Sequence, residues 1–292
     1  MTDPAASPLF NPAAFELPKN VVHVCAGGET PPLLRHAASF ASYLKDKADG
    51  MPGRISQTLV VERVRDRIGK MWRVAPDDVG FVSNVAEGVS MLCESITWQE
   101  GDNICFDGNE YPSVVVPFAL PAAGVPEIRL AEGKGPNRIL EKVDAHTRVI
   151  AVSYVSYLNG ERFDLANLRA KADEVGAILV VDYTQAAGYL PIDASIADFA
   201  FSACYKWLLG ITGCLLEQTP ATELASIDRR MAFAGERIAA ELFGGADAAN
   251  GCDALLARES FSCVTLCTRR CARFSGRLRD ASHSKSRSGI DG

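Results

Sequence analysis

The sequence predicts an α/β fold in which helices cover a mostly parallel sheet. From Val79 to about Leu216, short apolar segments alternate with amphipathic stretches, which is the pattern of successive strand–helix–strand units. Gly, Asp or Asn bounds most of these segments, and these residues favour turns and helix caps. Hydrophobic residues make up 48% of the 292 residues, so the chain can bury a sizeable core.

The individual elements follow from composition and from caps. The segments typical of strands are 81–83, 102–107, 148–154, 177–182 and 198–202. Asn84 can cap a helix over residues 86–96, and Asp164 and Gly176 delimit another helix with apolar residues on one face. Upstream, 59–72 predicts a charged amphipathic helix, whereas 39–53 predicts an irregular helix-and-loop region.

Composition favours small-molecule chemistry in the cytoplasm. The net charge of −6 leaves no general basic surface for nucleic acid. Residues 1–18 lack the regions of a signal peptide, and no apolar run reaches the roughly 18 to 20 residues that span a bilayer. The nine cysteines are an odd number, which favours free thiols in a reducing compartment. We therefore expect neither a nucleic-acid nor a membrane partner.

The chain changes character after Leu216. Residues 253–292 hold eight Lys or Arg and four Asp or Glu residues, and Ser, Arg and Cys replace the strand-like pattern. We expect one helix at 225–243, a disordered end at 282–292, and a truncated or frame-shifted reading beyond about residue 216. The four-residue spacing of Cys263, Cys267 and Cys271 could suggest a metal site on a helix face, but it matches no common zinc pattern, so no metal site is expected.

Several residues suit pyridoxal phosphate, which needs a lysine, an acid for its pyridine nitrogen, a phosphate cradle and a stacking group. Asp182 ends a predicted strand, and Gln185 follows three residues later. Lys206 lies between aromatic residues in an apolar setting, where desolvation would lower its pKa and make it nucleophilic. An isolated lysine of this kind is more often a surface residue.

Two further features are weaker alone. The turn at 83–88 joins a strand to a helix, and its free backbone N–H groups could bind a phosphate. Any capped helix start would look similar. Tyr111 follows a strand and could stack on the cofactor ring, although a partly buried structural tyrosine is an equally good interpretation.

Taken together, these motifs resemble the class V aminotransferase family, which includes cysteine desulfurases, selenocysteine lyases, kynureninases and isopenicillin-epimerase-like proteins. The matching segments are 84–88, 101–102, 110–112, 181–186 and 197–210. The resemblance covers Val79 to about Leu216, and the Asp-x-x-Gln motif with the later Lys is its most specific part. It implies a fold type I pyridoxal-phosphate transferase large domain with three α/β/α layers.

The resemblance also implies roles for these residues. Lys206 would be the catalytic Schiff-base lysine, Asp182 would face the ring nitrogen, and Gln185 would face the phenolic oxygen. Tyr111 would hold the stacking position that is usually His. Tyr205 could offer its hydroxyl to the phosphate.

Four more positions follow from the same resemblance. Val85 and Ala86 would offer only backbone N–H groups to the phosphate, because the family often has Thr there. Tyr157 and Asn159 resemble the loop on the substrate side of the ring. Tyr157 stands where cysteine desulfurases commonly have Asn, which favours the epimerase-like or general aminotransferase branch.

The predicted organisation has three parts. Residues 1–55 would be an N-terminal extension with a small-domain-like segment, 56–216 the cofactor-binding large domain, and 217–292 an atypical C-terminal segment. We expect a homodimeric enzyme that acts on a small amino acid by aminotransferase, epimerase or lyase chemistry. The alternative is a non-catalytic remnant that keeps the cofactor-binding fold. A nicotinamide-binding domain is disfavoured, because no Gly-x-Gly-x-x-Gly follows the first strands.

Overall fold

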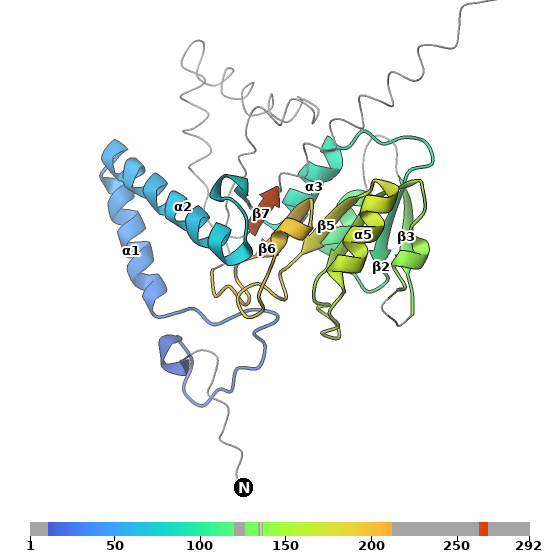
Figure 1. Ribbon diagram of the computed structural model, residues 1–292. Coiled ribbons are helices and arrows are strands. Elements are labelled where there is room, and N and C mark those ends of the chain that lie inside the picture. The colour runs from blue at the N-terminus through green and yellow to red at the C-terminus, as the bar shows by residue number, and fades with distance from the viewer. Residues whose placement is uncertain (1–10, 120–125, 134, 136, 212–262, 268–292) are drawn as a thin grey trace, which may run out of the picture.

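The computed structural model describes residues 11–119, 126–133, 135, 137–211 and 263–267, and these contain a seven-stranded sheet of order β1-β7-β6-β5-β4-β2-β3 (Figure 1). The strands are β1 (Val79–Val82), β2 (Asn103–Asp107), β3 (Glu127–Ala131), β4 (Thr147–Ser153), β5 (Ile178–Asp182), β6 (Phe199–Ala203) and β7 (Cys263–Cys267). Neighbouring strands from β3 to β6 pair in parallel, and among these strands β7 is the one that runs opposite to the rest. The predicted mostly parallel sheet is confirmed.

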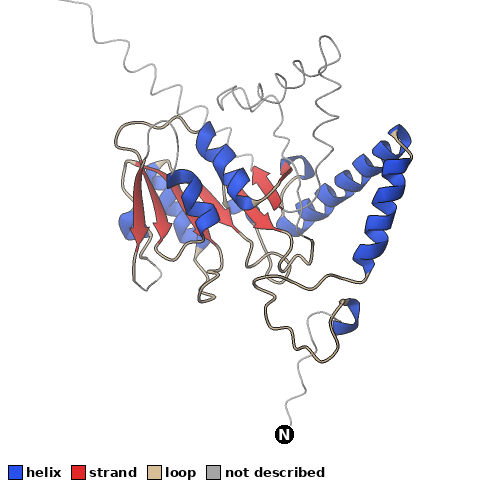
Figure 2. Cartoon of the chain, turned by 180° about the vertical axis from the view of Figure 1, so that it is seen from behind, coloured by secondary structure: helices blue, strands red, loops and turns tan. Residues whose placement is uncertain are grey.

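Helices cover both faces of this sheet (Figures 1 and 2). The described helices are α1 (Arg35–Ala48), α2 (Met51–Trp72), α3 (Val85–Ser95), α4 (Pro112–Ala119) and α5 (Leu165–Val175), with short 3-10 helices at Pro12–Ala14, Pro76–Asp78, Leu140–Lys142 and Ala194–Ile196. Of these, α1 lies beside α2 and projects away from the sheet. Alternate residues of β5 point to opposite faces: Leu179 packs in the core under α5 and the end of α2, whereas Val180 packs in the core under α3 and α4. The described helices include none with the length and hydrophobicity to cross a membrane.

Helix caps confirm the predicted boundaries of α3 and α5. The Asn84 side chain accepts a hydrogen bond from the Glu87 N–H at 2.9 Å, and the Glu87 carboxylate accepts one from the Ser83 N–H at 2.6 Å. This reciprocal pair satisfies donors that have no partner inside the helix. The Asp164 side chain accepts hydrogen bonds from the Ala166 and Asn167 N–H groups at the start of α5, and α5 ends at Gly176, whose φ of 75° is accessible to glycine at little cost.

The region before the sheet is more regular than predicted. Residues 39–53 were expected to form an irregular helix-and-loop region, but α1 continues to Ala48 and α2 begins at Met51. The two helices meet at Gly50, which has a φ of 67°, and Pro52 lies in the first turn of α2, where its missing N–H breaks no helical hydrogen bond. The predicted boundary between residues 55 and 56 falls inside α2. The division of the chain into three parts stays a prediction.

Three elements escaped prediction. Strand β3 lies at the edge of the sheet and carries Glu127 and Arg129, so it has no apolar run. Helix α4 contains Pro117 and a run of valines, which are poor helix formers. Strand β7 inserts between β1 and β6, although no strand was expected after Leu216 and its cysteines were considered on a helix face. Cys271 and the segments 225–243 and 282–292 lie outside the described residues.

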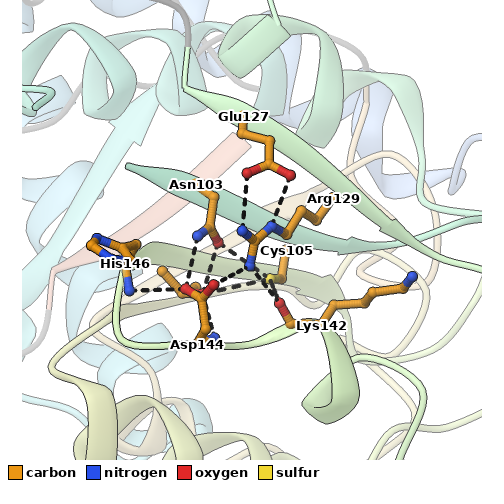
Figure 3. A network of polar contacts seen from close by, with 8 residues as sticks. Asn103, Cys105, Glu127, Arg129, Lys142, Asp144 and His146 are labelled. Atoms are coloured by element: carbon orange, nitrogen blue, oxygen red, sulfur yellow. Dashed lines mark hydrogen bonds and ion pairs between the residues drawn. The ribbon is translucent and has the colours of Figure 1, made fainter. Parts of the chain in front are cut away.

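A polar network joins the amino ends of β2, β3 and β4 (Figure 3). Arg129 pairs with Asp144 at 2.6 Å and with Glu127 at 2.9 Å. Asn103 donates to Asp144 at 2.9 Å and accepts a hydrogen bond from the Thr147 hydroxyl at 2.7 Å. Charged and polar side chains therefore join the three strands at this end, in addition to the apolar packing of Ile104 and Val149.

Candidate active site

The opposite end of the sheet gathers the residues predicted to carry chemistry. Asp182 is the last residue of β5, and Lys206 follows the adjacent strand β6 by three residues. Because parallel strands end at the same edge of a sheet, these side chains converge. Both are buried: Asp182 is 4% exposed and Lys206 is 7% exposed.

Burial moves both groups towards their neutral forms. It raises the pKa of the Asp182 carboxyl, against hydrogen bonds from Thr184 and the charge of Lys206. It also lowers the pKa of the Lys206 amine, against the charges of Asp182 and Glu29. The site therefore holds an amine inclined to be nucleophilic beside a carboxylate whose lost hydration is only partly replaced.

Aromatic rings surround the lysine. Lys206 Nζ lies 5.4 Å from the centroid of the Tyr111 ring and 5.8 Å from that of Tyr205. The Tyr111 ring in turn packs edge-on against Tyr157, with centroids 5.0 Å apart and an interplanar angle of 78°. Four residues that the sequence singled out separately thus lie in one group.

The start of α3 lies at the same edge of the sheet. Strand β1 runs in the same direction as β6, since both are antiparallel to β7. Helix α3 follows β1 and begins at Val85, which is 7% exposed. The N–H groups of Val85 and Ala86 lie in the first helical turn, where no partner exists within the helix, so they remain candidates for binding an anion.

Two predicted residues use their amides for structure. Gln185 Nε2 donates to the Gly27 carbonyl at 2.8 Å, and its Oε1 accepts from the Trp207 indole at 2.8 Å. Asn159 Oδ1 accepts from the Glu161 N–H at 2.9 Å, so this amide stabilises its own turn. Their proposed contacts with the cofactor or substrate stay predictions.

The N-terminal segment is a part of the site that sequence reasoning missed. The Thr30 hydroxyl donates to the Tyr205 carbonyl at 2.8 Å and also contacts the Lys206 carbonyl. The charge of Glu29 raises the pKa of Lys206, and the Gly27 carbonyl accepts a hydrogen bond from Gln185. The adjacent glycines at 27 and 28 were the available signal, because such a pair marks a backbone that turns sharply or is closely approached.

Tight backbone packing fixes the loop that carries the lysine. Gly188 has a φ of 109°, and a Cβ atom there would lie 2.1 Å from the Trp207 carbonyl oxygen. Only glycine allows the segment after β5 to approach the lysine loop this closely.

In the described part of the chain, no cluster of His, Cys, Asp and Glu side chains is suited to a metal ion.

Comparison with known proteins adds a family and a fold. Residues 46–216 match the family model for class-V aminotransferases. A probable cysteine desulfurase from Methanothermobacter thermautotrophicus is 26% identical over 206 residues, which cover 66% of this chain and 51% of that protein. The chain therefore spans about half the length of the curated relatives it matches.

Solved structures show the same fold at low sequence identity. The apo structure of a cysteine desulfurase from Thermococcus onnurineus has a TM-score of 0.61 at 21% identity, over 70% of this chain and 55% of that one. A C-DES variant with glycine covalently linked to its PLP cofactor also has a TM-score of 0.61, at 20% identity over 69% of this chain and 57% of that one. The predicted fold type I large domain is confirmed.

Proposed function

Because the chain belongs to the class-V aminotransferase family, we propose that it is a pyridoxal-phosphate-dependent enzyme that acts on a small amino acid. The observation that carries this proposal is the buried Lys206 amine, electrostatically coupled to the buried Asp182 carboxylate at the carboxyl edge of the sheet. The reaction would be of the aminotransferase, epimerase or lyase type. Buried groups with shifted pKa values cluster at functional sites, whereas an ordinary surface lysine stays solvated.

The residues of the site fit this cofactor. The Asp182 carboxylate suits a protonated ring nitrogen, because neither Thr184 nor Lys206 fully offsets its burial. The first turn of α3 offers N–H groups and a positive helix end to a phosphate. Tyr111 would stack on the ring, Tyr205 could donate its hydroxyl to the phosphate, and Gln185 would face the phenolic oxygen.

The chain's own groups then have defined tasks. When bound, pyridoxal phosphate supplies an aldehyde that joins to amines and a ring that withdraws electrons from the substrate's alpha carbon. Lys206 would hold the cofactor, and its amine, once displaced by the substrate amine, would accept the alpha proton. The lowered pKa favours the neutral form of that amine, which is the form able to accept a proton. Asp182 would keep the ring nitrogen protonated, and the paired rings of Tyr111 and Tyr157 would exclude water from one side.

Covalent trapping tests the lysine. Purified protein is incubated with pyridoxal phosphate, reduced with borohydride and digested, and mass spectrometry locates the modified residue. We expect a single modification at Lys206 and its loss in Lys206→Ala. The matched control is Lys171→Ala, a partly exposed lysine in α5 paired with Glu174, which should bind like the wild type. Equal labelling of several surface lysines, with none at Lys206, would contradict the proposal.

A panel of amino acids then separates the enzyme from its alternative. Cofactor-loaded protein that changes its visible spectrum with one small amino acid, and not with others, supports an enzyme and names the substrate class. Loaded protein that responds to none supports a non-catalytic cofactor-binding protein.

From the family resemblance we also propose a cytoplasmic homodimer without nucleic-acid or membrane partners, and light scattering of the purified protein tests the dimer.

A further inference from the structure

The residue before Tyr111 joins two strand ends. Glu110 Oε1 accepts a hydrogen bond from the Tyr111 N–H at 2.7 Å, and Glu110 Oε2 accepts one from the Ser153 N–H at 2.6 Å. The Ser153 hydroxyl forms a third hydrogen bond with Oε1. Ser153 is the last residue of β4, so one carboxyl group connects the segment after β2 with the end of β4. We refer to these three bonds as the Glu110 clamp.

We propose that Glu110 is a positioning residue: its clamp fixes the backbone at Tyr111 and thereby holds the Tyr111 ring beside Lys206. The lysine nitrogen lies 5.4 Å from the centroid of that ring, so a shift of the Tyr111 backbone changes the shape of the site directly. The use of the ring for stacking rests on the proposed function. The clamp itself consists only of protein groups and can be tested without a cofactor.

A carboxyl group is the side chain best suited to this place. Two N–H groups point at its two oxygens, and an ionised carboxylate accepts both together with the hydroxyl of Ser153. When protonated, it can donate its O–H to the Ser153 hydroxyl and still accept both N–H groups. A glutamine cannot do so, because its NH₂ group would face either the Tyr111 or the Ser153 N–H.

The charges around Glu110 make the clamp sensitive to pH. Burial raises the pKa of Glu110 to about 7, with a further contribution from Asp182, while hydrogen bonds from Ser153 and Tyr111 oppose the rise. Asp182 faces it from β5, where it pairs in register with Ser153, and Lys206 interacts with Asp182 from the loop after β6. The closed clamp thus holds a proton more tightly than a solvated Glu110 does. Raising the pH from the ordinary 4.5 to about 7 therefore favours opening.

Hydrogen exchange in the cofactor-free full chain tests the clamp. Protection of the Tyr111 and Ser153 amides, taken relative to their intrinsic exchange rates, should fall as the pH rises towards about 7 and then level off. In Glu110→Gln, protection at pH 6 should drop about tenfold, because one buried donor has no acceptor. The pH dependence should also disappear, because the amide does not titrate. The control Glu174→Gln, an exposed glutamate of α5, should match the wild type.

A second variant keeps the test decisive if Glu110→Gln folds poorly. Ser153→Ala leaves the carboxyl group and both N–H donors in place but removes the hydroxyl hydrogen bond that lowers the pKa of Glu110. The midpoint of the pH profile should therefore move to higher pH. A residue that merely fills space would not produce such a displacement.

The outcomes separate the clamp from the cofactor. Wild-type protection in Glu110→Gln, or an unmoved midpoint in Ser153→Ala, overturns the proposal whether or not the protein binds pyridoxal phosphate. If the wild type binds pyridoxal phosphate, Glu110→Gln should weaken that binding about tenfold through the displaced Tyr111 ring. If it does not bind, the proposed function fails, and the exchange profiles still decide whether the clamp exists.

Discussion

The two ends of the sheet hold their charged residues in opposite states. At the amino ends of β2, β3 and β4, hydrogen bonds from Arg129 and Asn103 hold the pKa of Asp144 well below its usual range. At the carboxyl ends of β5 and β6, burial raises the pKa of Asp182 and lowers that of Lys206. One end thus favours the charged forms of its groups, and the other favours the neutral forms.

The difference shows where the fold gains stability and where it leaves room for a ligand. A carboxylate that is already paired contributes to folding but has little left to offer a cofactor. A buried carboxylate with incomplete compensation lowers stability and binds a cationic partner more strongly, because that partner replaces the lost hydration. The network at the amino ends of β2, β3 and β4 and the candidate chemistry at the carboxyl ends of β5 and β6 therefore lie at opposite edges of the sheet, although the buried Arg138–Asp107 pair also lies at the carboxyl edge.

The largest expected effect concerns a buried ion pair at the carboxyl end of β2, and it tests how much that pair contributes to stability. Arg138 and Asp107 form an ion pair at 2.8 Å with side chains 5% and 3% exposed, and Arg138 also pairs with Glu161. Arg138→Met should lower the free energy of unfolding by about 3–5 kcal/mol, because it leaves the Asp107 carboxylate buried and alone. Urea unfolding measures this change.

The control for that prediction is an exposed pair. Arg73 and Asp193 lie 3.6 Å apart with side chains 69% and 50% exposed. Arg73→Met should cost less than about 1 kcal/mol, since water already solvates both charges. If the two variants lose the same stability, burial does not distinguish these ion pairs, and the contrast between the ends of the sheet loses its basis.

A matched pair of substitutions separates cofactor binding from stability. Asp182→Asn should weaken pyridoxal-phosphate binding about a hundredfold, because the neutral amide loses the charge that pairs with the ring nitrogen. Without cofactor its stability should be unchanged or higher, since an amide has no buried charge to desolvate. Asp144→Asn should do the reverse, lowering stability while affinity stays at the wild-type level. Calorimetric titration and thermal melting of both variants give the comparison.

The sequence was sufficient for elements whose signals are local. The apolar segments and the caps at Asn84 and Asp164 placed most of the sheet and two helices, because these signals lie within a few residues of the structure they specify. Strand β3 could not be recognised, because the pairing of Arg129 with Asp144 that accommodates its charge joins residues 15 positions apart. Strand β7 depends on pairing with β1 and β6, which is non-local by nature.

Local signals also predicted part of the site, whereas its non-local contacts could not be predicted. Asp182 and Lys206 were predictable, since the ends of parallel strands meet at one edge. The bond from Gln185 to Gly27 spans 158 residues, so its amide could not be assigned to the N-terminal segment in advance. Glu110 was read as part of a motif without a role, because its partner Ser153 lies on another strand, 43 residues away.

The smallest expected effect concerns pH, where the two ends should differ in sign. The lowered pKa of Asp144 means that its contribution is complete above the ordinary value of 3.8 and is lost as the pH falls through the folded pKa. Its side chain is 44% exposed, so Asp144→Asn should remove less than about 1 kcal/mol, and only above the acid range. Wild-type stability should fall as the pH rises from 4.5 to about 7, because Glu110 loses its proton, and Glu110→Gln should abolish this fall. In urea unfolding across the pH range, the stability deficit of Asp144→Asn relative to the wild type should grow as the pH rises through the acid range, whereas that of Glu110→Gln should shrink between pH 4.5 and about 7. Two deficits with the same pH dependence would contradict the contrast.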